Sequence, residues 1–348
     1  MNNITDFKTE FLVVGASVAG SLLADKLANF GKTIFTDKYE PGTLMNCGGG
    51  MPIDVFSSMK IDIPYLPVEK AVMDLKNASY PFPLNYVIVN RSEFDNALFK
   101  KAKKAGADFL RLNYQSHDPN NNTAVFLDQK HKKVIIEYKK IILAYGFHPR
   151  REPFFGKKRK EPFGAAVVQI IDCPSPFNND LYFQILTGSP GYTWVFPMLD
   201  NKINIGTGTL TTSDFSRKAF SDFKKQYGIA GKIIVKGGGV FPIKTPIIIQ
   251  KGSVYLFGDA AGMINALNGE GIRHINTMAA KFATALAKGK NMNFFWWSSG
   301  TFYYLLTASS VFKVFRIIEK LTRIPLYKIS CKYVAKLKKN IGVKSACK

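Results

Sequence analysis

Cysteine is scarce and scattered in this chain, which limits the metal and disulfide chemistry open to it. The sequence of 348 residues has four cysteines, Cys47, Cys173, Cys331 and Cys347, with no CxxC pair. Zinc sites draw their ligands from Cys and His at short, regular spacings. We therefore expect no metal site, and free thiols are the state expected in a reducing cytoplasm.

The sequence also lacks a clear membrane-targeting segment. Residues 1–10 are polar and contain no apolar signal-peptide core. Residues 294–312 carry no charge and many aromatic side chains, but their Ser, Thr and Gly content makes them a poor membrane span. A buried helix or an interfacial helix fits this composition better. We expect a cytoplasmic protein that associates peripherally with the membrane.

Acidic residues are in short supply. The chain has 25 Asp and Glu against 48 Lys and Arg, which gives a formal net charge of +23. Such a charge attracts polyanions: nucleic acid, an anionic membrane surface or phosphorylated substrates. No nucleic-acid-binding motif is present, so we expect no nucleic acid partner. Basic clusters at residues 157–160 and 313–339 favour an anionic membrane surface; a lysine-rich composition without a specific partner is the alternative.

What the sequence does contain is a βαβ pattern at its N-terminal end. An apolar run at residues 11–14 predicts a buried strand, residues 16–30 predict a helix, and residues 33–36 predict a second strand ending at Asp37. Gly31 is expected to end the helix as its C′ residue. With 46% hydrophobic residues, the chain is expected to form one large unit or two modest domains.

The turn between this strand and helix, residues 15–20, matches a GxGxxG fingerprint with Ser17 at the middle glycine. Gly15 permits the tight turn, Gly20 permits close helix–strand packing, and the helix N-terminus suits a pyrophosphate. Asp37, 22 residues after Gly15, is placed to accept a ribose hydroxyl. An ordinary strand–turn–helix is the alternative reading of this segment taken alone.

A second glycine segment lies far along the chain. Residues 254–257 predict a buried strand that leads into Gly258 and Asp259, and a helix is expected from Gly271 to Ala287. The carboxylate suits a ribose or ribityl hydroxyl, and the helix dipole would stabilise negative charge on a reduced flavin. FAD is long enough to need both segments, whereas NAD needs only the first.

Other segments predict a helix at residues 92–104, separate strands at 134–136 and 141–143, and alternating β patterns from residue 163 to 244. Within the last region we expect a strand at residues 181–186. A hairpin is expected that pairs residues 193–196 with 203–205 through a turn at Asp200–Asn201.

The two glycine segments together resemble those of flavoproteins such as aromatic hydroxylases, halogenases and geranylgeranyl reductases. Three further segments narrow the resemblance to the geranylgeranyl reductase family, including archaeal digeranylgeranylglycerophospholipid reductases: NCGGG at 46–50, NRSEFD at 90–95 and PGYTWVFP at 190–197. The resemblance implies an α/β fold: an FAD-binding Rossmann-like domain, an inserted antiparallel β-sheet substrate domain and a C-terminal helical segment. The FAD-binding domain is expected at residues 1–60, 90–150 and 250–290. The substrate-binding β-sheet domain is expected at residues 61–89 and 151–249, and the basic and aromatic helical tail at residues 291–348.

Carried over by position, the resemblance implies a set of FAD contacts: Gly15, Ser17, Ala19, Gly20, Asp37, Cys47, Gly48, Arg91, Asp259, Gly269, Gly271 and Ile272. It also brings Cys47 close to flavin and substrate, which suggests a catalytic role in proton delivery or alkene positioning. The alternative for a lone Cys is a small packed residue.

Strand alternation puts Tyr192, Trp194 and Phe196 on one face, and Pro197 limits that strand to an edge or an end. The functional interpretation is an aromatic wall for an isoprenoid substrate, and simple core packing is the alternative. The sequence departs from the family at Tyr145, where relatives have Asp, and at residues 265–267, where relatives have a proline.

The resemblance implies an FAD-dependent reductase that saturates C=C bonds of geranylgeranyl or other isoprenoid chains, with archaeal membrane ether lipids as the expected substrates. A flavin monooxygenase or halogenase, and a non-catalytic membrane-associated flavin or lipid-binding protein, remain as alternatives. With no second GxGxxG in the sequence, the electron donor could be NAD(P)H or a ferredoxin.

Overall fold

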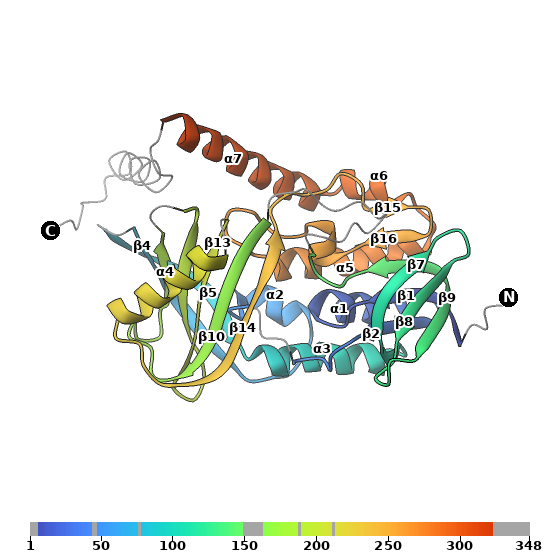
Figure 1. Cartoon of the computed structure of the whole chain (residues 1–348), viewed down its shortest axis with the longest axis horizontal. Coiled ribbons are helices and arrows are strands. Elements are labelled where there is room, and N and C mark those ends of the chain that lie inside the picture. Colours follow the sequence, from blue (N-terminus) through green and yellow to red (C-terminus); the bar gives the residue numbers. More distant parts are fainter. Residues whose placement is uncertain are drawn as a thin grey trace.

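The computed structural model describes residues 6–43, 47–75, 78–148, 163–186, 189–210 and 213–322. These residues form two β-sheets with helices packed against them (Figure 1). The mixed α/β fold with a Rossmann-like sheet and a second, mostly antiparallel sheet is the predicted one. The basic runs at 157–160 and 323–339, together with Asn46, Cys331 and Cys347, lie outside the described residues.

The first sheet contains the parallel core expected for nucleotide binding. Its strand order is β15-β16-β9-β1-β2-β6, and all pairs from β16 to β6 are parallel. A two-stranded extension, β7 and β8, joins it at β9. The strands are β1 (Phe7–Val14), β2 (Thr33–Asp37), β6 (Asp108–Arg111), β7 (Asn113–Asp118), β8 (Thr123–Leu127), β9 (Lys133–Leu143), β15 (Gln250–Lys251) and β16 (Val254–Leu256).

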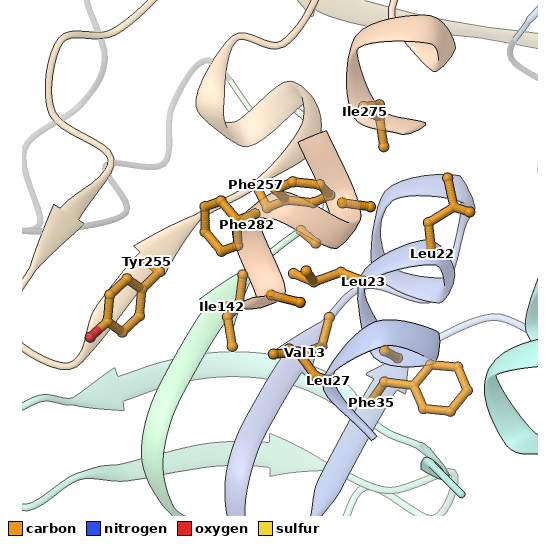
Figure 2. Packing of buried hydrophobic residues seen from close by; sticks show 14 of the residues in the cluster. Val13, Leu22, Leu23, Leu27, Phe35, Ile142, Tyr255, Phe257, Ile275 and Phe282 are labelled. Atoms are coloured by element: carbon orange, nitrogen blue, oxygen red, sulfur yellow. The ribbon is translucent and has the colours of Figure 1, made fainter. Parts of the chain in front are cut away.

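Three helices complete this half of the molecule: α1 (Val18–Leu27), α3 (Arg91–Lys104) and α5 (Ile272–Ala287). Helix α1 contacts both of the others. The apolar runs seen in the sequence are buried, because parallel strands are covered on both faces. Figure 2 shows side chains from β1, β2, α1 and α5 packed together with the strands beside them, among them Val13, Leu23, Leu27, Phe35, Ile142, Phe257 and Phe282.

The second sheet has the order β14-β10-β13-β12-β11-β4-β5-β3, and only the β4–β11 pair is parallel. The predicted hairpin is confirmed as β12–β13, with positive φ at Asp200 and Asn201 in its turn. The strands are β3 (Gly50–Pro52), β4 (Tyr65–Asp74), β5 (Ser79–Val89), β10 (Phe163–Asp172), β11 (Leu181–Ile185), β12 (Gly191–Pro197), β13 (Lys202–Thr209) and β14 (Lys232–Pro242).

The remaining helices are α2 (Ile53–Ser58), α4 (Ser213–Gln226), α6 (Met292–Trp297), α7 (Gly300–Thr322) and the 3₁₀ turn η1 (Gly258–Ala261). Helix α4 lies in the region expected to be all β, and it covers the second sheet with Phe220 and Phe223. The aromatic stretch after residue 291 forms α6 and the first part of α7. Within the described residues, every helix is too short or too polar to cross a bilayer.

Two local predictions are wrong. Residues 134–143 form one continuous strand, β9, rather than two. The backbone of the polar residues between the two apolar runs pairs with β1 in the same register as the apolar runs do. Gly31 is not a left-handed C′ residue: α1 ends earlier, with Ala28 as its right-handed C-cap. A Cβ on Gly31 would lie 2.5 Å from the Glu10 carboxylate and 3.2 Å from the Phe11 ring, so a larger residue there would have to displace the Glu10 side chain.

Candidate functional site

A large cavity of about 1210 Å³ lies between the two sheets. Residues of both sheets, of α1, α3 and α5 and of the loops around them line it. Every site residue expected from the sequence lines this cavity except Gly20, namely Gly15, Ser17, Ala19, Asp37, Cys47, Gly48, Arg91, Tyr192, Trp194, Phe196, Asp259, Gly269, Gly271 and Ile272. Gly20 lies behind the wall, where a Cβ would stand 1.7 Å from the Gly15 carbonyl oxygen.

The β1–α1 turn forms a cradle that excludes side chains. Gly15 has φ +111°, and a Cβ there would lie 2.5 Å from the Ala144 carbonyl oxygen. Ser17 is the N-cap of α1, but its side chain does not cap the helix. The first-turn N–H groups of α1 are therefore left without a side-chain acceptor at the cavity wall, where they suit an anionic group.

Asp37 stands at the end of β2 beside this cradle. Its Oδ2 accepts a hydrogen bond from the Ala16 N–H at 2.9 Å, and its Oδ1 accepts one from the Tyr39 N–H at 3.1 Å. These bonds fix the carboxylate at the cavity wall, and each oxygen keeps a further lone pair. A pair of ribose hydroxyl groups would find acceptors here.

Ser17 and Arg91 share a partner that the sequence did not suggest. Arg91 Nε and Nη2 donate to Asp95 Oδ1 and Oδ2 at 2.9 and 3.0 Å, and Ser17 Oγ donates to Asp95 Oδ2 at 2.8 Å. Burial alone would lower the pKa of Arg91, but the charge of Asp95 and the contact with the Cys47 side chain raise it above its usual value. The serine at the middle position of the fingerprint thus helps to hold a charged guanidinium at the cavity.

The far end of the cavity contains Asp259 and the start of α5. Burial raises the pKa of Asp259 to about 6, although the charge of Arg91 lowers it in part. The N-cap of α5 is Gly271, which has no side chain to satisfy the first-turn N–H groups. The preceding loop is tied to the second sheet, because the Tyr192 hydroxyl donates to the Asn268 carbonyl oxygen at 2.7 Å.

Cys47 lies on a glycine loop pressed against the aromatic side chains of β12. A Cβ on Gly48 would lie 2.5 Å from the Phe196 ring, so only glycine fits there. The Gly49 N–H donates to Cys47 Sγ at 3.5 Å, and Arg91 also contacts this side chain. The thiol is half-buried beside a permanent positive charge.

Asn204 connects this loop to the sheet. The Trp194 indole N–H donates to Asn204 Oδ1 at 3.0 Å, and Asn204 Nδ2 donates to the Cys47 carbonyl oxygen at 3.0 Å. Asn204 is 2% exposed. Its side chain thus bonds to both the backbone of the Cys47 loop and the aromatic strand, and it positions Cys47 relative to Trp194.

The predicted alternation along β12 is confirmed, since Tyr192, Trp194 and Phe196 all face the cavity. Their neighbouring ring centroids are 6.0 and 6.3 Å apart. Pro197 stands at the end of β12, which is an interior strand of the sheet. Further apolar side chains extend this wall: Met73, Phe82, Leu84, Leu181, Phe183, Ile185, Leu186 and Phe241.

Sequence reasoning missed Asp95 and Asn204. The first had a usable signal, because Asp95 stands four residues after Arg91 on a predicted helix, the spacing of a side-chain pair. The second had none, since Asn204 meets Cys47 across a separation of 157 residues. At Tyr145, where the family has Asp, the ring stacks on Tyr114 at 5.9 Å and lines the cavity.

The cavity fits FAD in its donor set. The cradle at Gly15 and the uncapped N-terminus of α1 match a pyrophosphate, and Asp37 matches a ribose. Asp259 and the uncapped N-terminus of α5 match the ribityl chain and the flavin ring. No cluster of three or more His, Cys, Asp or Glu side chains suited to a metal occurs in the part of the chain that the structure describes.

Comparison with known proteins agrees with this geometry. No protein-family model matches the chain. It is 27% identical over 298 residues to the digeranylgeranylglycerophospholipid reductase of Thermoplasma acidophilum, covering 76% of this chain and 74% of the relative. It is 28% identical over 342 residues to the geranylgeranyl diphosphate reductase of Rhodobacter capsulatus, covering 90% and 84%. The chain is thus similar in sequence to curated reductases of geranylgeranyl chains.

Solved structures support the same fold. A geranylgeranyl bacteriochlorophyll reductase-like protein from Thermoplasma acidophilum superposes with a TM-score of 0.71 at 20% identity, covering 90% of this chain and 84% of that one. A flavin-dependent brominase gives a TM-score of 0.62 at 13% identity, covering 87% and 84%. The predicted resemblance is confirmed, and the halogenases are more distant relatives in fold.

Proposed function

We propose that this protein is an FAD-dependent reductase that saturates C=C bonds of isoprenoid chains, with geranylgeranyl chains of archaeal membrane ether lipids as its substrates. The observation that carries the proposal is the large cavity, which joins a nucleotide cradle to an aromatic and apolar wall. At about 1210 Å³ it exceeds the range of about 300–1,000 Å³ usual for one small ligand. It has room for a cofactor and a hydrocarbon chain together.

The residues that would hold FAD divide between the two ends of the cavity. Gly15, the start of α1 and Asp37 would bind the ADP part, and Asp259 with the start of α5 would bind the flavin part. When bound, FAD supplies the hydride that the alkene needs. An isolated alkene is a poor hydride acceptor, so a proton must reach its other carbon.

Cys47 is the residue we assign to this proton transfer. Its thiol gives the proton to the alkene carbon that does not receive the hydride, so that one hydride and one proton together saturate the bond. The thiolate left on Cys47 Sγ is stabilised by the Arg91 guanidinium, which contacts it. Asn204 fixes the loop that carries the thiol, through the Cys47 carbonyl oxygen.

The aromatic wall of β12 has the complementary role of holding the chain and excluding water. Trp194 is 7% exposed, and its ring lies over Gly206, where a Cβ would stand 2.2 Å away. A chain bound against this wall displaces water from the reacting carbons, which strengthens every electrostatic interaction there. Rigid aromatic rings suit an elongated hydrocarbon because they offer flat apolar area at little entropic cost.

The substrate class and the charge of the chain suggest the partners. A lipid substrate places the enzyme peripherally at the cytoplasmic surface of a membrane, and the net charge of +23 favours an anionic one. The electron donor in this proposal is NAD(P)H or a ferredoxin, and the same positive charge would attract an acidic ferredoxin.

An anaerobic experiment tests the proposal. The protein is purified with FAD, the flavin is reduced, and a geranylgeranyl lipid dispersed in detergent is added while flavin absorbance is followed. Reoxidation by the lipid without oxygen, with appearance of saturated product, is the expected result. Reoxidation only by oxygen with hydroxylated product would instead support a monooxygenase, and no effect of lipid would support a non-catalytic carrier.

A further inference from the structure

The most exposed large apolar side chains of the described residues come from one stretch of the sequence. Seven of them range from 49% exposed at Leu267 to 68% at Phe294, whereas the next in order, Ile234 on β14, is 46% exposed. All seven fall between residues 247 and 314. The seven are Ile247, Ile248, Leu267, Phe294, Tyr303, Tyr304 and Val314. These seven residues and Trp297 are called the apolar face.

Hydrogen bonds hold the segments of the apolar face together. The Trp297 indole N–H donates to the Ile247 carbonyl oxygen at 2.8 Å, and the Trp296 indole N–H donates to the Pro246 carbonyl oxygen at 2.9 Å. The Tyr304 hydroxyl accepts from Asn265 Nδ2 at 2.9 Å. These bonds tie α6 and the start of α7 to the loops at Pro246–Ile247 and Asn265, on the side of the molecule where Figure 1 shows α6, α7 and β15.

Leu267 connects the apolar face to the proposed active site. Its side chain is part of the exposed set and also lines the cavity, next to Ala266 and Asn268. A hydrocarbon chain in contact with the apolar face thus meets the edge of the cavity directly.

The charge flanking the apolar face is mainly positive, and the acidic residue near Leu267, Glu270, is paired with Arg273 at 2.9 Å. The sequence from residue 271 to residue 318 contains no Asp or Glu, and residues 243–251 contain none either. Lys244, Lys251, Lys288 and Lys290, all exposed, flank the loop and helix α6. Exposed Trp, Tyr and Phe with flanking lysines are the composition of a surface that rests in the headgroup region of an anionic bilayer.

We propose that the apolar face docks on an anionic lipid bilayer, so that an isoprenoid chain passes from the leaflet past Leu267 into the cavity. The docking stands on the exposed side chains and the charge, and its role in substrate delivery rests on the proposed function. A second copy of this chain is the other occupant that such a face could have, but two copies would bring together two surfaces of the same positive charge.

Tryptophan fluorescence gives a direct measurement. The chain has three tryptophans, and Trp194 and Trp296 are buried while Trp297 is 41% exposed. Full-length, FAD-loaded protein is mixed with vesicles of phosphatidylcholine alone or with added phosphatidylglycerol. A blue shift of emission and co-sedimentation with the anionic vesicles are expected, because Trp297 leaves water on docking.

Two matched variants locate the binding surface. Phe294→Glu adds one negative charge within the apolar face, and Ile234→Glu adds the same charge to an exposed apolar position on β14. Phe294→Glu is expected to weaken vesicle binding by about tenfold or more, which corresponds to about 1.4 kcal/mol. Ile234→Glu is expected to bind as the unmodified protein does.

Equal binding by Phe294→Glu and the unmodified protein, or no binding of the unmodified protein to anionic vesicles, would overturn the inference. So would a self-association that sedimentation velocity detects and Phe294→Glu abolishes. Turnover of detergent-dispersed lipid separates this inference from the proposed function. The Phe294→Glu variant should still turn over this lipid. If the unmodified protein does not turn it over, the reductase proposal fails, and the vesicle-binding result still stands.

Discussion

Replacing Asn204 by leucine should loosen the contact between the Cys47 loop and the aromatic wall. The substitution keeps the approximate volume but removes both hydrogen bonds of the amide, one from Trp194 and one to the Cys47 carbonyl oxygen. A buried polar group left without a partner costs about 1–3 kcal/mol. The indole N–H is buried, whereas Cys47 is half-buried at the cavity, where water can reach its carbonyl. We expect the free energy of unfolding of the Asn204→Leu variant to be lower by about 2 kcal/mol.

The assay is urea unfolding of the flavin-free protein, performed as a double-mutant cycle with Trp194→Phe. Either single change leaves one polar group unpaired, whereas the double variant removes both groups of the Trp194–Asn204 bond. The double variant should therefore be more stable than the sum of the single effects by about 1 kcal/mol. In turnover, Asn204→Leu should lower kcat with FAD retained, since the thiol is no longer held in place.

Additive effects in this cycle would refute the structural reasoning, because they would show that Asn204 and Trp194 do not interact. An unchanged kcat in a variant that is measurably less stable would leave Asn204 a purely structural residue. Asn204→Asp is a useful third variant. It keeps an acceptor for Trp194 but presents a carboxylate to the Cys47 carbonyl oxygen, so it should reproduce the loss of kcat.

Three further outcomes are expected. Gly20→Ala puts a Cβ 1.7 Å from the Gly15 carbonyl oxygen, so α1 must shift and the flavin-to-protein ratio after gel filtration should fall sharply. Cys47→Ser should retain FAD but slow saturation of the alkene in single-turnover absorbance measurements, and a normal rate would exclude Cys47 as the proton donor. Burial raises the pKa of Asp259 to about 6. The folded flavin-free protein then holds this proton more tightly than the unfolded chain, and unfolding free energy should fall by about 2 kcal/mol between about pH 4 and pH 6. Asp259→Asn should flatten that loss in urea titrations across this range.

The nucleotide-binding half could be predicted from the sequence because its signals are local. Gly15, Gly20 and Asp37 mark a strand, a turn and a helix through short-range steric rules, and the structure places them accordingly. The hairpin at Asp200–Asn201 was predictable for the same reason, since Asp and Asn adopt positive φ readily and mark the short loop between two apolar strands.

The parts that the sequence did not predict depend on tertiary contacts. The middle of β9 looks polar enough to be a turn, but Lys140 donates to the Leu286 carbonyl oxygen and lies over the Phe11 ring. The role of Asn204 likewise exists only once distant strands and loops meet. Helix α4 is the exception, because Phe215, Ala219 and Phe223 recur at the four-residue spacing of a helix, a local signal that the surrounding β patterns obscured.

The serine in the GxGxxG fingerprint has a consequence for the newly made protein. Ser17 occupies the N-cap position of α1 yet gives its hydroxyl to Asp95, and Gly271 gives α5 no side-chain cap either. Loss of a side-chain cap costs a helix about 1 kcal/mol, and a glycine N-cap such as Gly271 costs roughly 0.3 kcal/mol. A chain that folds before it meets its flavin therefore begins with two weakened helix ends, both of which a bound dinucleotide would complete. The supply of flavin in the cell would then set how much of the protein survives unfolding and proteolysis, as well as how much of it is active.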